Sequence, residues 1–178
     1  MGMKKVLLVI LMLAVLSGLA FGQEEKKPTA AVSFVLLGGI VAPIGINAEF
    51  FLGPVGLAAE VRGIFIGYGG NLIGSVEPGA NVRFYFSGLD SSMYLMGGVS
   101  YLTVFAIGEG SAGLANAGIL KPKAAVGYNA LFGKSNRTRF AIELGAVYMR
   151  PVLEGDVIPM SDMFPILPHF QLMFGRAF

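Results

Sequence analysis

Apolar and polar side chains alternate along several parts of the sequence, which is the period of a β-strand with two unlike faces. In residues 79–86, Val82 and Phe84 share one face while Asn81 and Arg83 share the other. Such a division predicts strands that present one face to an apolar surrounding and the other face to polar groups.

Eight segments follow this pattern or are apolar on both faces, and each has about the length that a tilted strand needs to cross a bilayer. They are residues 31–38, 46–52, 55–66, 79–86, 93–105, 121–132, 139–149 and 169–178. Closing an even number of antiparallel strands into a cylinder leaves no unpaired backbone edge in the membrane. The pattern therefore predicts an all-β fold, an eight-stranded antiparallel transmembrane β-barrel formed by residues 31–178.

Membrane-spanning helices are the alternative interpretation of this hydrophobicity. Residues 28–48 and 91–108 carry no charge and are long enough to cross as helices. Glycine pairs interrupt both segments, at residues 38–39 and 97–98, and Pro43 interrupts the first as well. The interruptions, and the alternation elsewhere, favour strands.

The predicted connections alternate in length along the chain. Short turns are expected at residues 53–54, 87–92 and 133–138, and long loops at residues 67–78, 106–118 and 150–168, with a modest loop at 39–43. Outer-membrane barrels have short periplasmic turns and longer extracellular loops in the same alternation. The connections therefore support the barrel.

The first 22 residues have the layout of a secretory signal peptide. Lys4 and Lys5 precede an apolar run over residues 6–16, and small residues fill positions 17–22, so cleavage is expected before Gln23. A retained membrane anchor is disfavoured because a charged segment follows so closely. Residues 23–30 are then a short linker to the barrel domain. The sequence has no cysteine, which excludes a lipid-modified N-terminal cysteine and a disulfide framework.

Composition indicates an apolar surrounding rather than water, and it gives no sign of a nucleic-acid partner. Only 13% of residues are charged and 54% are hydrophobic, whereas soluble proteins carry about 25% charged residues. Of 13 basic and 11 acidic side chains, removing Lys4 and Lys5 leaves equal numbers. A nucleic-acid partner is therefore not expected, since such proteins present a basic patch.

Charged side chains on the predicted inner faces are the main candidate for a functional site. They are Glu49, Glu60, Arg62, Arg83, Lys123 and Glu143. An eight-stranded barrel is only wide enough for its side chains to fill, and buried charges persist when they are paired. We expect a salt-bridged, largely closed interior, with Glu49 paired to Arg62 or Arg83 and Lys123 paired to Glu143. The alternative is a gated path for ions, in which the partners exchange.

The C-terminal segment carries a resemblance to a known family. Bacterial outer-membrane barrels end in an aromatic residue preceded by alternating apolar positions, and four residues here match: Phe170, Leu172, Phe174 and Phe178. Arg176 departs from the pattern, because the family usually has an apolar residue or tyrosine there. The chain thus resembles the small OmpA-, OmpX- and OmpW-type barrels. The resemblance implies outer-membrane lipid as surrounding, the barrel assembly machinery as a partner of the last strand, and a monomer.

Catalysis and metal binding have little support in the sequence. The one histidine, His169, is followed by Phe170 and Gln171, so the His-x-Ser pair of some lipid-modifying barrels is missing its serine. One histidine and no cysteine also leave only scattered carboxylates as metal ligands. We expect no enzyme activity and no cofactor.

The predicted last loop is unusually apolar. It carries Ile158, Met160, Met163 and Phe164. Apolar loop residues indicate packing over the barrel mouth or contact with a small hydrophobic ligand. The second possibility agrees with the resemblance to OmpW-type barrels, which implies a narrow channel that passes small hydrophobic molecules laterally into the membrane.

Overall fold

The protein is described by a computed structural model at residues 27–38, 42–68, 71–107, 117–133, 137–153 and 165–178. Within these residues every helix or strand assigned is a β-strand. The described residues contain no helix that is long and apolar enough to cross a membrane. The predicted signal peptide and the first part of the predicted linker lie outside the described residues.

The strands expected from the alternation are present, and most are longer than predicted. Their bounds are β1 Ala30–Gly38, β2 Ile44–Leu52, β3 Val55–Tyr68, β4 Asn71–Tyr85, β5 Ser91–Ile107, β6 Ala117–Phe132, β7 Thr138–Tyr148, β8 Arg150–Leu153 and β9 Ile166–Ala177. The first uncharged segment that is long enough for a membrane helix contains β1 and the first five residues of β2, and the second contains the whole of β5. The choice of strands over helices is thereby confirmed.

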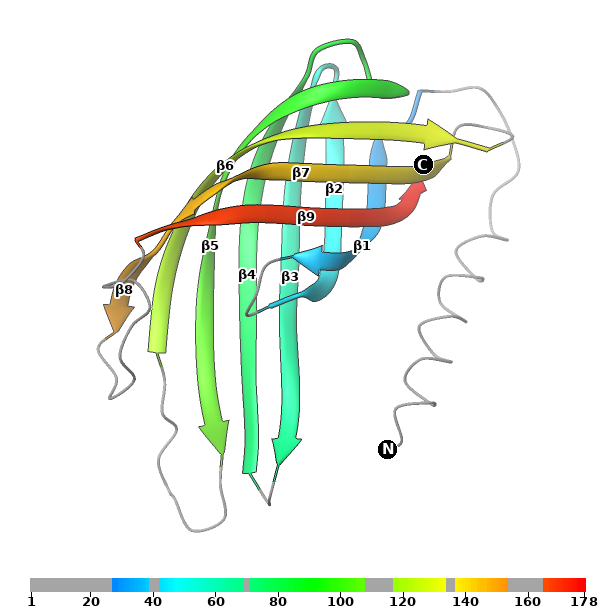
Figure 1. Ribbon diagram of the computed structural model, residues 1–178. Coiled ribbons are helices and arrows are strands. Elements are labelled where there is room, and N and C mark those ends of the chain that lie inside the picture. The colour runs from blue at the N-terminus through cyan, green and yellow to red at the C-terminus, as the bar shows by residue number, and fades with distance from the viewer. Residues whose placement is uncertain (1–26, 39–41, 69–70, 108–116, 134–136, 154–164) are drawn as a thin grey trace.

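The strands form one closed antiparallel sheet (Figure 1). Each strand from β1 to β6 pairs with the next, β7 pairs with β9, and β9 pairs with β1. The short β8 continues the line of β7 beyond Met149 and pairs with β6. The described residues therefore make an eight-membered ring of strands, as the sequence predicted, with β7 and β8 together serving as one member.

The ring is staggered, which tilts the strands. The stagger is measured by stepping from each residue to its register partner on the next strand, once round the barrel. A path that starts at Ala177 on β9 passes through Glu49, Asn81 and Lys123. It returns to β9 at Leu167, ten positions before Ala177. A closed sheet with such a stagger must have strands inclined to the barrel axis. The stagger also places residues from distant strands at the same height inside the barrel.

The outer face is apolar and the inner face is mixed or polar along most of the wall. Exposed outward side chains include Val126 on β6 and Leu144 on β7, whereas their inward neighbours Asn129 and Glu143 are buried. Because successive side chains in a strand point to opposite faces, this is the division that the alternation predicted.

One end of the barrel, called the turn end here, carries the C-terminus and the connections after β2, β4 and β6. Glycines with positive φ lie in all three connections, at Gly53, Gly88 and Gly133. A glycine adopts this left-handed backbone without the steric cost that other residues bear. The opposite end is called the loop end.

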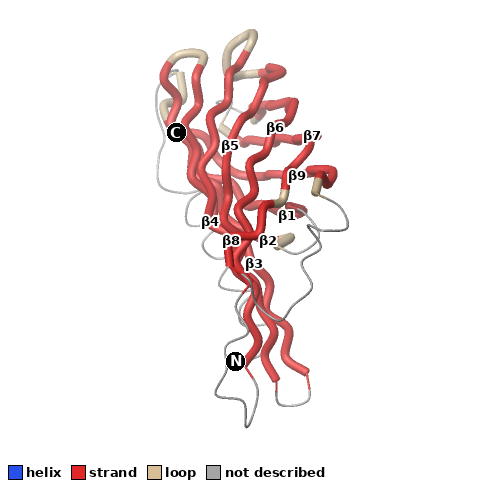
Figure 2. The backbone as a smooth tube through the Cα atoms, turned by 90° about the vertical axis from the view of Figure 1, so that its left-hand side faces the viewer, coloured by secondary structure: helices blue, strands red, loops and turns tan. Residues whose placement is uncertain are grey.

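The wall is much taller on one side at the loop end. The last register pair of β2 with β3 is Ile44 with Gly63, whereas β3 and β4 stay paired as far as Tyr68 with Asn71. Strands β3 to β5 accordingly extend well beyond β1 and β2 in Figures 1 and 2. The prediction of a long loop over residues 67–78 was wrong, because β4 already begins at Asn71. The predicted loop over residues 150–168 likewise contains β8 and the start of β9.

Candidate functional site

The charged side chains of the strands gather inside the barrel. All six predicted interior charges are buried there, and a further four ionisable side chains join them: Glu77, Lys121, Arg139 and His169. Lys121 is the most exposed of these ten, with 12% of its side chain accessible. The interior groups divide by their contacts into two ion networks, one above the other along the barrel axis.

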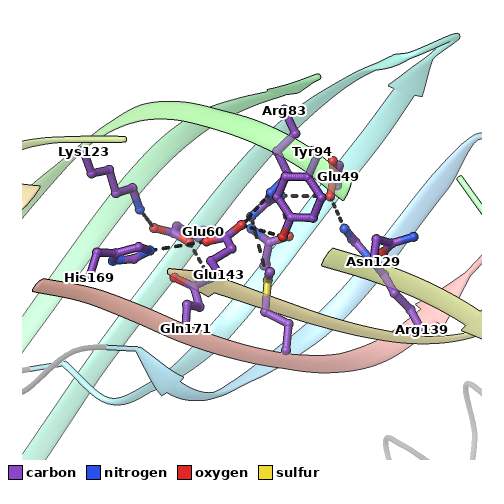
Figure 3. Close-up of polar contacts among 12 residues, drawn as sticks. Glu49, Glu60, Arg83, Tyr94, Lys123, Asn129, Arg139, Glu143, His169 and Gln171 are labelled. Atoms are coloured by element: carbon purple, nitrogen blue, oxygen red, sulfur yellow. Dashed lines mark hydrogen bonds and ion pairs between the residues drawn. The ribbon is translucent and has the colours of Figure 1, made fainter. Parts of the chain in front are cut away.

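The turn-side ion network alternates base and acid from His169 to Arg139 (Figure 3). His169 Nε2 lies 3.3 Å from Glu143 Oε2, and Arg83 Nη2 lies 2.8 Å from Glu143 Oε1. Arg83 Nη1 lies 2.8 Å from Glu49 Oε2, which in turn lies 2.7 Å from Arg139 Nη2. Arg83 is fully buried and sits between two carboxylates, so it is the centre of this network.

The loop-side ion network alternates in the same way from Lys121 to Lys123. Lys121 Nζ lies 2.8 Å from Glu77 Oε2, and the Arg62 guanidinium donates to the other oxygen of Glu77. Arg62 also lies 3.7 Å from Glu60 Oε1, which forms an ion pair with Lys123. Three bases therefore share two carboxylates.

Neutral polar groups complete both networks. Tyr85 donates to Glu49 at 2.8 Å, Tyr94 donates to Glu143 at 3.0 Å, and Ser100 donates to Glu77 at 2.6 Å. The Gln171 amide donates to Glu60 at 3.2 Å, and its oxygen accepts from Arg62 at 3.4 Å. Each buried carboxylate thus accepts from at least two donors, as buried charges require.

The predicted pairings were right in part. Glu49 is paired with Arg83, one of its two predicted partners, but the predicted pair of Lys123 with Glu143 was wrong, because Lys123 reaches Glu60 on β3. Glu77 was not among the predicted interior charges, because residues 67–78 were expected to form a loop. Arg139 and Lys121 could have been included, because both occupy polar positions of predicted strands.

Apolar clusters lie at the two ends of the polar interior. The turn-end cluster contains the aromatic side chains Phe51, Tyr85 and Tyr94, together with Met96 and Leu131. The loop-end cluster is formed by Leu102, Ile119 and Met149, with Val104 and Leu167 packed against it. Both ion networks lie between these clusters along the barrel axis, and every charged member except Lys121 is at most 5% exposed.

The four residues of the resemblance to outer-membrane terminal strands all alternate along one side of β9 or directly follow it. Phe170, Phe174 and Phe178 are exposed and Leu172 is half-buried, and they face outward. Arg176 shares this outer face, where its guanidinium lies 6.0 Å from the centre of the Phe178 ring. The predicted loop contacts Ile158, Met160, Met163 and Phe164 lie outside the described residues.

A shallow apolar hollow lies on the outer wall over β2 to β5. Its volume is about 550 Å³, and small residues are prominent in its lining, among them Ala48, Ala59, Ala80 and Gly97. Larger apolar side chains such as Phe50 and Val99 border it. The hollow belongs to the apolar outer surface and has no contact with the ion networks. Among the described residues, no group of three or more histidines or carboxylates could hold a metal ion.

Comparisons with known proteins do not identify a function for this chain. No protein-family model and no curated protein matches the sequence. Among solved structures, the crystal structure of a major outer membrane protein from Thermus thermophilus is similar to this chain, with a TM-score of 0.43 and 12% sequence identity over 84% of this chain and 98% of that chain. The function has to be inferred from the barrel's own geometry.

Proposed function

We propose that this chain is an integral outer-membrane β-barrel with a structural or surface-interaction role and a closed, salt-bridged interior. The outward apolar side chains suit contact with lipid, and the closed ring satisfies the backbone groups that a bilayer cannot. The proposal includes export across the inner membrane, insertion as a monomer through the assembly machinery, and no enzymatic activity.

The observation that carries the closed interior is the burial of the paired charges, of which only Lys121 is more than 5% exposed among the ten ionisable side chains of the two networks. A hydrated ion that crossed the interior would have to displace buried bases such as Lys123 or Arg83 from their carboxylates. Breaking a buried ion pair costs about 3–5 kcal/mol because a charge is left uncompensated. Such a path does not support rapid conduction.

The closed interior predicts no conductance above background when the purified mature protein is placed in planar lipid bilayers. The Lys123→Ala variant, which removes one base of the loop-side network, is expected to be silent as well. Insertion is checked by protease protection of the same preparation. A steady conductance in the wild type that changes in the variant would show a gated ion path and overturn the closed interior.

A second function, binding of a small hydrophobic molecule, is favoured by the inner face at the loop end. Ile66 and Ile73 lie opposite each other on β3 and β4. They share the inner face with Arg62 and Glu77, which lie nearer the middle of the barrel. They are nevertheless 55% and 53% exposed. An exposed pair of large apolar side chains inside the tall part of the wall is a surface on which an aliphatic chain could bind.

This second function predicts that Ile66→Asn with Ile73→Asn weakens binding of a fluorescent fatty acid by at least about tenfold, since burying each isoleucine is worth about 1.5–3 kcal/mol. Leu72→Asn is the matched control, because Leu72 lies beside Ile73 but on the outer face. If the wild type, the double isoleucine variant and Leu72→Asn bind the fatty acid with equal affinity, the hydrophobic-ligand function is excluded and the structural function remains.

A further inference from the structure

The described part of β3, β4 and β5 that lies beyond the end of β2 is called the tip here. The last row of register partners that includes β2 runs from Ile44 through Gly63 and Val76 to Thr103. The residues beyond this row form the tip (Figure 2): 64–68, 71–75 and 104–107. None of them is charged. A sheet that projects into water usually protects its edge with charged side chains, so the tip is unusual for a water-exposed sheet.

The outer face of the tip is apolar and continuous with the wall below it. Phe65, Leu72 and Ile107 are exposed there, and the Phe65 and Phe105 rings lie with their centres 5.8 Å apart. All six charged residues of β3 to β6 belong to the ion networks inside the barrel. The outer face of these four strands therefore carries no charged side chain between the turn end and the tip. An apolar surface of this extent indicates contact with a membrane or another apolar partner.

The tall side of the wall is longer than the usual lipid-facing band. Strand β2 has 9 residues and β5 has 17. With a rise of about 3.4 Å per residue and a tilt of about 35–45°, β2 measures about 22–25 Å along the barrel axis and β5 about 41–47 Å. The apolar band of outer-membrane barrels is about 25 Å tall. Only the short side of the wall matches this height.

A charged side chain ends the apolar face on another side of the barrel. Arg150 on β8 is exposed and is the register partner of Leu120 on β6, which pairs in turn with Tyr101 on β5. Ile107 lies further towards the loop end than this row. The outer face thus becomes charged at β8 but stays apolar through the tip on β3 to β5.

We propose that the outer face of the tip lies in lipid hydrocarbon, so that the bilayer reaches further along β3 to β5 than along β8. Inclination of the protein or local thickening of the bilayer accommodates an apolar wall that exceeds the hydrocarbon thickness, at modest cost. Transfer of Phe65, Leu72 and Ile107 from water to hydrocarbon favours this position. A second copy of the chain is a poorer occupant, because the apolar face of the tip continues without a break into the proposed lipid-facing wall. The inference rests on the membrane location proposed above.

The test uses nitroxide labels on single cysteines, since the chain has no cysteine of its own. In phospholipid vesicles, Phe65→Cys and Ile107→Cys report on the tip. Leu144→Cys is the lipid reference near the middle of the wall, and Arg150→Cys is the water reference on the same outer face. Electron paramagnetic resonance measures collisions of each label with oxygen, which concentrates in hydrocarbon, and with a nickel complex, which stays in water. Circular dichroism checks that each variant keeps its strands.

The ratio of oxygen to nickel collisions is expected to exceed unity at Phe65→Cys and Ile107→Cys, as at Leu144→Cys, and to fall below unity at Arg150→Cys. A ratio below unity at both tip positions, with lipid contact at Leu144→Cys, would place the tip in water and overturn this inference alone. Shielding of both tip labels from both reagents would reveal a protein partner, such as a second copy, and overturn it as well. A ratio below unity at Leu144→Cys would instead contradict the membrane location itself.

Discussion

Replacing Arg83 by methionine is expected to lower the free energy of unfolding of the barrel by about 3–5 kcal/mol. Arg83 is the shared partner of Glu49 and Glu143 at 2.8 Å each, and all three side chains are fully buried. Methionine fills much of the same space but leaves both carboxylates short of positive charge. Glu49 keeps its ion pair with Arg139, so the loss of positive charge affects mainly Glu143. Urea-induced unfolding in phospholipid vesicles, followed by circular dichroism, measures the change.

Two further variants separate the charge effect from lost packing. Adding Glu143→Gln to Arg83→Met should recover part of the stability, because the amide needs no counter-charge, and the two changes should therefore not be additive. Arg176→Met removes an arginine from the outer face and is expected to change stability by less than about 1 kcal/mol. A loss below about 1 kcal/mol for Arg83→Met would mean that the interior charges are well solvated, which contradicts a closed barrel.

The Leu144→Arg substitution is expected to destabilise the barrel by about 2–4 kcal/mol in a bilayer, because Leu144 faces outward near the middle of β7. A charged side chain at this depth must leave water for hydrocarbon. The matched control is Leu52→Arg at the end of β2, beside the Gly53 turn, where the cost should fall to about 0–1 kcal/mol. Both variants are measured by the same unfolding assay in vesicles.

The contrast tests the proposed membrane location independently of any interior contact. Leu144 and Leu52 are similarly exposed, at 59% and 64%. In a water-surrounded barrel both arginines would be surface substitutions that change stability by no more than about 0.5 kcal/mol. Equal and small effects at the two positions would therefore exclude a lipid-facing outer wall.

The number of strands and the direction of their side chains could be predicted, because apolar and polar residues alternate where the two faces of a strand meet different surroundings. The height of the wall could not be predicted from the sequence. Residues 67–78 contain Gly67, Gly74 and Pro78, which usually indicate a loop. In the structure Gly74 is covered by the Phe65 and Phe105 rings, whose centres are 5.8 Å apart.

Pro78 is accommodated by a gap in one ladder. Its β4 neighbours Val76 and Gly79 pair with β5, but no register pair forms between β4 and β5 at Pro78 itself. Proline has no N–H to donate, so it is tolerated where the ladder does not need one. Local sequence does not reveal which ladder position is dispensable, because that depends on the neighbouring strand.

The sequence predicts which residues form the candidate site better than it predicts which of them pair with each other. The alternation of inward and outward positions along each strand determines which charged side chains lie inside the barrel. The partner of each charge depends instead on the stagger of the ring and on the reach of side chains across the interior. Lys123 and Glu143 lie on neighbouring strands, yet Lys123 reaches Glu60 from across the barrel. Nothing within a single strand encodes that choice.

The pairing of β1 with β9 constrains how the barrel can form. Thr29 N donates to Phe178 O at 2.7 Å, and Phe178 N donates to Ala30 O at 2.8 Å, so the first and last described residues of the sheet meet. Contacts of such large sequence separation form slowly. The wall cannot close until β9 has been synthesised, because β9 is the pairing partner of both β1 and β7. Until then the apolar side chains of the other strands belong to an open sheet with two unpaired edges, an arrangement that favours aggregation.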